Sequence, residues 1–497
     1  MRSNYRIANI IFTFFAIAAF AAIVLMQKNV YGYDDEVRFS VIDREMYSFP
    51  EEIDWQDKTI RFEDEEGRKF ECVLKDKRLS VYNGDRLVWM SDRDFFVQDM
   101  FVADIDPKEE KGVNEQRARS KEEIVVLLWK KGRYGMYRPF WVNEDEKGFS
   151  QHIFVYNTVN EEVKPRWGSS YMGKEASSMS FSENGILFLN HKGASETAWK
   201  WYSFGFEKLE DVKIFAAGDN LIHEPIYVDA LNKYNGNFDH IYKKVKSYTR
   251  NADISILNLE TPLIYDSKKY STYPCFGTPA SNGEAIKKAG FNVVTLSTNH
   301  RFDKGATGVS DTLEIIDDCN LLHVGSMDEK PYLLIKRNEM VFAILNYTYG
   351  TNGIRPPKGY ENGVNYLDNE ERIREEIREA KKNADFIIVC PHWGTEYRTT
   401  PDSYQIKWRD VFYEEGVDLV LGTHPHVLEP YEMYKTGDSD HEMLVYYSLG
   451  NYISANQRQE HNSGGLAFIN VALTSSGPVI KSYDLKEIDT MYKSSKY

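Results

Sequence analysis

Carboxylate, amide and imidazole side chains recur where apolar segments end after about residue 211 of the 497-residue chain. These side chains belong to Asp219, Glu260, Asn299, His392, His424 and His426. Their donor atoms suit divalent Mn, Fe or Zn ions. Two such ions a few Å apart turn a water into hydroxide and hold phosphate oxygens during in-line attack. The sequence therefore predicts a site for two divalent cations that supports hydrolysis.

The segment Gly-Thr-His-Pro-His-Val at 422–427 carries two of these histidines. It follows the apolar run 417–421, which has the pattern of a buried strand. His424 and His426 therefore leave one strand end together, and Pro425 stiffens the link between them. A single His-x-His pair is weak evidence for a metal, so the prediction depends on the other strand ends.

Glu260, His300 and Asp303 each suit a specific role in such a site. One residue must bridge two ions, which a carboxylate does best, so Glu260 is the natural candidate. His300 directly follows Asn299 and is placed to protonate a leaving oxygen as a general acid. Asp303 lies three residues further on and is placed to orient His300 or a ligand.

Each residue also has an ordinary structural explanation. Asp219 follows a glycine and suits a helix N-cap, Glu260 suits a surface acid, and Asn299 suits a turn. The three histidines can likewise be structural. Recurrence at five strand ends favours one shared site, because ligands bind at the carboxyl ends of strands in open α/β sheets. The remaining histidines lack such placement, and His223 is the one nearest Asp219.

The elements that must position these side chains alternate between strands and helices from about residue 211, which predicts βαβ units and a covered sheet. We expect strands at 212–217, 253–257, 291–296, 386–390, 417–421, 444–447, 466–473 and 479–485. We expect helices at 283–289, 306–317, 369–383 and 404–415, and a hairpin around 337–339.

Six motifs in residues 211–485 resemble the bacterial capsule synthesis family typified by CapA, the poly-γ-glutamate capsule proteins. They stand at 217–219, 258–262, 299–303, 392–396, 422–427 and 448–452. The family resembles the calcineurin-like metallophosphoesterases, which implies a four-layer αββα sandwich with two metals. The resemblance implies one metal on Asp219, Glu260 and His426, and the other on Glu260, Asn299, His392 and His424. Asn451, in the last motif, is the expected substrate contact.

Two positions depart from the broader phosphoesterase pattern. That pattern begins Asp-x-His, whereas this chain has Asp219-Asn220-Leu221. The first metal position therefore lacks one histidine of the pattern. Glu260 also stands where the pattern usually has aspartate.

Residues 34–208 have a different pattern and lie outside the resemblance. Short apolar segments alternate with turn signals, which predicts an all-β module, with blade-like repeats as one interpretation. Strands are expected at 59–62, 70–74, 79–82, 86–90, 123–129, 151–156 and 185–189. The tryptophans of this module either fill its core or stack on a bound polymer.

The chain is too long for one compact domain, and we divide it into 1–33, 34–208 and 209–497. Its net charge of -15 argues against nucleic-acid binding. The apolar run 7–26 follows Arg2 and Arg6 and is long enough to cross a bilayer. We therefore predict a transmembrane anchor in residues 1–33, with a cytoplasmic N-terminus and an extracytoplasmic bulk. A cleaved signal peptide is the alternative.

Together these features predict a membrane-anchored protein of capsule or anionic-polymer assembly with metal-dependent hydrolase activity. The expected partners are a polymer such as poly-γ-glutamate and membrane subunits of a capsule synthase. One alternative is a non-catalytic accessory that binds polymer or the synthase. Another is a surface phosphodiesterase or nucleotidase unrelated to capsule.

Overall fold

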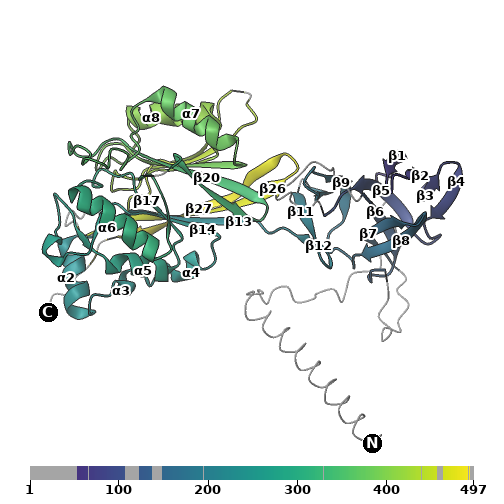
Figure 1. Cartoon of the computed structure of the whole chain (residues 1–497), viewed down its shortest axis with the longest axis horizontal. Coiled ribbons are helices and arrows are strands. Elements are labelled where there is room, and N and C mark those ends of the chain that lie inside the picture. Colours follow the sequence, from purple (N-terminus) through teal and green to yellow (C-terminus); the bar gives the residue numbers. More distant parts are fainter. Residues whose placement is uncertain are drawn as a thin grey trace, which may run out of the picture.

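The computed structural model describes residues 53–64, 66–106, 122–136, 148–193, 195–327, 329–437, 439–455, 463–490 and 492. The expected membrane anchor in residues 1–33 lies outside these ranges. Among the residues described, no helix combines the length and the apolar character needed to cross a bilayer. In Figure 1, strands β1 to β12 form one end of the molecule and the α/β elements form the other.

Three antiparallel sheets of four strands each follow one another along the β-rich end. The first contains β1 (Lys58–Glu63), β2 (Lys69–Lys75), β3 (Arg78–Asn83) and β4 (Arg86–Met90). The second contains β5 (Phe96–Ala103), β6 (Glu123–Lys131), β7 (Phe149–Val159) and β8 (Glu162–Gly168). The third contains β9 (Ala176–Phe181), β10 (Ile186–His191), β11 (Ser195–Tyr202) and β12 (Gly205–Lys208).

The second of these sheets is buried on both faces. Alternate residues of a strand point to opposite faces, so Val126 of β6 packs toward the first sheet and Leu127 toward the third. This explains why β6 is apolar along most of its length rather than alternating with polar residues. Trp129 and Trp201 are buried, so these two tryptophans fill the interior.

The α/β end contains two large sheets. The first has the order β18-β17-β14-β13-β26-β27, and β25 also pairs with β13. Its strands are β13 (Val212–Asn220), β14 (Ile254–Asn258), β17 (Val293–Thr295), β18 (Leu322–Val324), β25 (Asn451–Ile453), β26 (Ser463–Thr474) and β27 (Gly477–Asp489). The second has the order β19-β20-β21-β22-β24-β23. Its strands are β19 (Tyr332–Arg337), β20 (Met340–Thr348), β21 (Phe386–His392), β22 (Leu419–Leu421), β23 (Tyr431–Tyr434) and β24 (Met443–Tyr446). The short strands β15 (Leu263–Ile264) and β16 (Thr278–Pro279) form a separate pair.

Helices cover the outer faces of both sheets (Figure 1). The first sheet is covered by α2 (Glu224–Lys233), α3 (Asp239–Tyr242), α4 (Lys246–Thr249), α5 (Ser281–Ala289) and α6 (Gly305–Asp318). The second is covered by α7 (Glu370–Lys381) and α8 (Ser403–Glu414). Ile256 and Phe342 belong to one core between the two sheets, so the layers run helix, sheet, sheet, helix.

The parallel strands of both sheets end toward the same region. β13, β14 and β17 run parallel in the first sheet, as do β20, β21 and β22 in the second. The end of β13 and the start of β25 approach closely, because a Cβ on Gly218 would lie 1.9 Å from the carbonyl oxygen of Gly450. Only glycine permits this approach, which sets Asp219 beside Asn451.

The β-rich end contacts the α/β end through β26. Leu473 of β26 packs against Ile186, Phe188 and Ala198 of the third β sheet. Lys200 also forms an ion pair with Glu339, at 2.8 Å. The two ends therefore share a small apolar contact with charged groups beside it.

Candidate metal centre

The six expected ligand residues converge where the strands of the two sheets end. Asp219 lies at the end of β13, Glu260 and Asn299 follow β14 and β17, and His392 ends β21. His424 and His426 lie in the loop after β22. All six side chains are buried, and none is more than 5 % exposed. Several ionisable groups thus share a dry site, which makes it a candidate functional site.

One group of donors consists of Asp219, Glu260 and His426, whose donor atoms lie within 4.8 Å of one another. The Nδ1 atom of His426 lies 3.1 Å from Oδ2 of Asp219. Its Nε2 atom lies 3.6 Å from Oε1 of Glu260. This is the set expected for the first metal.

A second group consists of Glu260, His392 and His424, again within 4.8 Å of one another. The Nε2 atom of His392 lies 3.8 Å from Oε1 of Glu260. It also lies 3.0 Å from Oδ1 of Asn299, so Asn299 lies beside this group. Glu260 belongs to both groups, the position that a bridging carboxylate needs. The assignment of individual ligands stays a prediction.

Buried atoms without partners show that these residues fit cations. Both carboxylate oxygens of Glu260 and Nδ1 of His424 are buried and have no hydrogen-bond partner. Buried polar atoms are normally paired, so each such exception needs an explanation. Carboxylate and imidazole are metal ligands, and a bound divalent ion would satisfy all three atoms.

The pKa shifts of the ionisable residues also favour cation binding at this site. Burial, followed by the charge of Asp219, raises the pKa of Glu260 well above its usual range. Burial lowers the pKa values of His392 and His424, so both imidazoles stay neutral, the form that binds metals. Burial alone would lower the pKa of His426, but Glu260 and Asp219 raise it to about 10. The carboxylates thus require positive charge beside them.

Residues that sequence reasoning did not single out hold the ligands in place. Asn258 donates to Oδ1 of Asp219 at 2.7 Å and accepts from the hydroxyl of Thr295 at 2.8 Å. The hydroxyl of Thr423 lies 3.0 Å from Nδ1 of His392, and Nε2 of the same ring is directed at Asn299 and Glu260. Both residues belong to sequence motifs, at 258–262 and 422–427, which was the available signal. Such outer partners fix the orientation of metal ligands.

The expected general acid is held firmly. His300 is 5 % exposed, and its Nδ1 donates to Oδ2 of Asp303 at 2.8 Å. The backbone N–H of Phe276 donates to the same oxygen at 2.6 Å, and the Phe276 ring packs edge-on against His300 at 4.8 Å. Asp303 is therefore placed to orient His300, as expected, and Nε2 of His300 is left for a substrate proton.

Asn451 and His223 also lie close to the centre. Oδ1 of Asn451 accepts from Nδ1 of His426 at 3.1 Å, and its side chain is buried. This contact orients His426, while contact of Asn451 with substrate stays a prediction. His223 packs against Phe276 and is near His300 and His426. Among the described residues, however, none of the converging donor groups includes His223.

The backbone carrying the histidine pair is unusual. His424 has φ +99° and His426 has φ +59°, a region that side chains other than glycine rarely adopt. Such conformations persist only where surrounding contacts enforce them, and they cluster at functional sites. Here the backbone N–H of His424 donates to Oδ2 of Asp219 at 3.2 Å, which helps to fix the loop.

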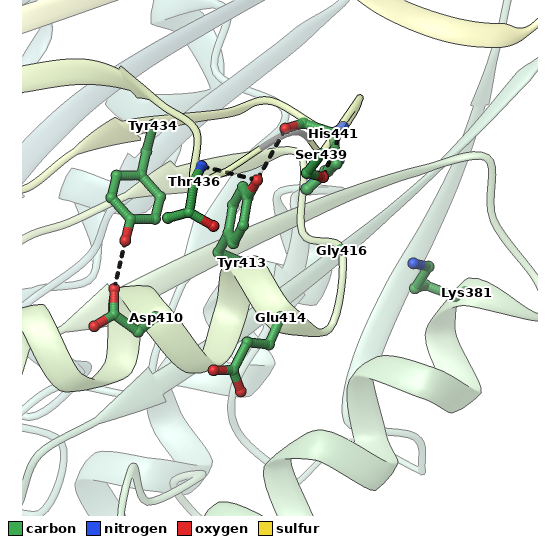
Figure 2. Close-up of a pocket in the computed structure, with 9 residues that line it drawn as sticks. All are labelled: Lys381, Asp410, Tyr413, Glu414, Gly416, Tyr434, Thr436, Ser439 and His441. Atoms are coloured by element: carbon green, nitrogen blue, oxygen red, sulfur yellow. Dashed lines mark hydrogen bonds between the residues drawn. The ribbon is translucent and has the colours of Figure 1, made fainter.

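A separate pocket of about 480 Å³ lies beside α8 (Figure 2). Its lining residues are Lys381, Asp410, Tyr413, Glu414, Gly416, Tyr434, Thr436, Ser439 and His441. The hydroxyl of Tyr413 accepts from the backbone of Thr436 at 3.1 Å and donates to the carbonyl of His441 at 3.2 Å. The pocket shares no residue with the metal centre.

Residues 213–456 match the model of a family described as bacterial capsule synthesis protein PGA_cap. Capsule biosynthesis protein CapA of Bacillus anthracis is 30% identical over 238 residues, which cover 45% of this chain and 56% of that protein. PGA biosynthesis protein CapA of Bacillus subtilis (strain 168) is 32% identical over 234 residues, 46% of this chain and 60% of that protein. The chain thus spans between half and two thirds of the length of these relatives.

Solved structures give weaker matches. The calcineurin-like phosphoesterase YfkN from Bacillus subtilis is 13% identical, with a TM-score of 0.36 over 56% of this chain and 91% of that chain. The Haemophilus influenzae NAD nucleotidase NadN is 14% identical, with a TM-score of 0.36 over 55% of each chain. A TM-score below 0.5 does not establish a shared fold.

Proposed function

We propose that this chain, whose residues 213–456 match the bacterial capsule synthesis family, acts in the assembly of a capsule or a similar anionic polymer such as poly-γ-glutamate. The names of the two CapA relatives support this role. The apolar run at residues 7–26 supports anchoring in the cell membrane with the bulk of the chain outside the cytoplasm. A membrane subunit of a polymer synthase is then the expected partner.

The chemistry we propose is metal-dependent hydrolysis at the site formed by the two donor groups. The observation that carries it is Glu260, a buried carboxylate shared by both groups with neither oxygen paired. Asp219 and His426 would complete one cation position, and His392 and His424 the other. Bound Mn, Fe or Zn ions would supply an activated water and polarise the bond to be cleaved.

The chain's own residues would perform the proton transfer. His300 would donate a proton from Nε2 to the leaving oxygen, because its Nδ1 is held by Asp303. Asn258 and Thr423 would keep Asp219 and His392 in the orientations that ligands need. Burial of the whole group would exclude bulk water and strengthen each electrostatic contact.

The first test is the metal content of a purified chain beginning near residue 34. We expect about two equivalents of Mn, Fe or Zn in the wild type, and their loss in a His392→Ala/His424→Ala double variant. A His441→Ala variant is the matched control, because it removes an imidazole outside the site. A folded wild type that binds no metal after loading would refute the dimetal site.

A second function is a non-catalytic accessory that binds polymer or the synthase. It is favoured by Leu221, which stands where the phosphoesterase pattern has its first histidine and brings no imidazole to the first group. This accessory role predicts bound metal without hydrolysis. Assays of the loaded protein on a phosphodiester and on poly-γ-glutamate distinguish the two functions.

A further inference from the structure

A third group of converging donors lies at the exposed side of the metal centre. It consists of Glu396, His424 and His426, whose donor atoms lie within 4.8 Å of one another. The two histidines are buried, whereas the side chain of Glu396 is exposed. Nδ1 of His424 has no hydrogen-bond partner although it is buried. An exposed carboxylate therefore stands beside imidazoles that face the interior.

Contacts within the loop hold Glu396 beside the histidine pair. The next residue, Tyr397, donates its backbone N–H to the carbonyl of Pro425 at 2.7 Å. The preceding residue, Thr395, donates its hydroxyl to Asp402 at 2.7 Å, and Asp402 caps α8. Glu396 is thus fixed on both sides rather than carried by a free loop.

The third group overlaps both buried groups. It shares His426 with the group containing Asp219, and His424 with the group containing His392. A neutral imidazole has one nitrogen lone pair available to a cation. The third group and both buried groups therefore cannot all hold cations at once. A cation can therefore occupy the exposed position only while at least one buried position lacks its full set of ligands.

We propose that Glu396, His424 and His426 form an entry station, where a divalent cation docks from solvent before it moves to the buried positions. The inference rests on the proposed dimetal site. The exposed carboxylate replaces part of the water shell of the arriving ion, and the shared histidines pass the ion inward. Departing ions follow the same path in reverse.

An entry station affects the rates at which cations are loaded and released. It lowers the barrier for entry and for exit by the same amount, because both directions cross the same transition state. Removing it slows loading and release equally and leaves the equilibrium affinity unchanged. A resident ligand behaves differently, because its loss weakens the affinity.

The test uses Zn²⁺ and the full ectodomain with four proteins: wild type, Glu396→Gln, Glu396→Asp and Glu371→Gln. Glu371 is an exposed glutamate on α7 and controls for the loss of one surface charge. Loading of stripped protein is followed by stopped-flow with a fluorescent zinc indicator, and release is followed after mixing with excess chelator. We expect Glu396→Gln to slow both rates by about tenfold with unchanged Kd and stoichiometry. Glu396→Asp should fall between Gln and wild type, because its charge remains but its reach is shorter.

Unchanged rates in Glu396→Gln would overturn the entry station. A raised Kd or fewer bound ions in that variant would also overturn it, because Glu396 would then be a resident ligand. A wild type that binds no cation would remove the dimetal function itself. Failure of the inference alone is therefore distinguishable from failure of the proposed function.

Discussion

His300 has a well-defined orientation in the site, because Asp303, itself held by the Phe276 backbone, binds its Nδ1. Replacing His300 with alanine should lower kcat by about 10²–10⁴ for esters with an alkyl leaving group, which need a proton. The loss should be much smaller for p-nitrophenyl esters, whose leaving group needs none. Equal losses on both substrates, at unchanged metal content, would contradict a proton-donor role.

Glu429 provides a prediction about pH. Burial raises its pKa to about 7, a change partly opposed by the hydrogen bond from Gln405. Because this value exceeds the ordinary 4.5, the unfolded chain loses the proton first, and stability falls as pH rises from 4.5 to about 7. The loss amounts to at most roughly 3 kcal/mol.

Glu429→Gln should abolish this loss and make the protein more stable than wild type at pH 8, with little difference at pH 4. Urea unfolding at both pH values, in chelator, measures it. Glu371→Gln is the control, since Glu371 is exposed. A pH dependence identical to wild type in Glu429→Gln would contradict the assignment.

Individual site residues could be predicted from the sequence only where the neighbouring residues placed them at the end of a strand. Asp219, Glu260 and the histidines were recognisable because each follows an apolar run that had to be a strand. Glu396 was not singled out, although it ends the motif at 392–396, because an acidic residue in a polar loop resembles any solvated acid. The contact of Asn451 with His426 was equally inaccessible, because pairing between β25 and β13 joins segments far apart in the chain.

At the scale of elements, the close approach of β13 and β25 sets the position of Asp219. Gly218→Ala would place a Cβ against the Gly450 carbonyl, so the strands must separate. We expect a loss of stability of about 1–3 kcal/mol together with weaker metal binding. Urea unfolding and metal titration measure both. Gly350→Ala is the control, because nothing lies within 4 Å of its added Cβ, and an equally small effect in both variants would contradict the argument.

The sequence predicted α5, α6, α7 and α8 well, because each has a clear apolar stripe or a highly charged outer face. It missed α2, whose sequence begins Glu-Pro and mixes polar and apolar residues on its buried side. It also missed β8 and β9, because Pro165 and several serines weaken the pattern of a strand. Packing against neighbouring strands decides such segments, and a local pattern does not contain it.

At the scale of the whole molecule, every donor of the metal centre comes from the α/β end. A chain restricted to residues 209–497 should therefore bind the same cations as a chain beginning near residue 34. Its stability should fall by about 1–2 kcal/mol, because Leu473 loses its cover from Ile186 and Phe188. Metal analysis and urea unfolding test this, with the longer chain as control. A folded fragment without metal would contradict it.

The division between a β-rich and an α/β part was readable from the change of periodicity near residue 211. The arrangement of two sheets around a common core came only with the resemblance to a known family. Periodicity shows that a segment such as 386–390 is buried, but not which sheet it joins. Ile214 and Ile388 belong to the same core although they stand 174 positions apart in the chain.

The pairing of β13 with β25 and β26 also determines when the metal centre can assemble during synthesis of the chain. Asp219 emerges early, yet the His424 backbone that it holds follows 205 residues later. A polypeptide grows from its N-terminus, so the β-rich part is complete before any of the six donor residues has been made. The centre forms only once nearly the whole chain has been produced. A chain that stops before His424 therefore cannot complete either buried donor group.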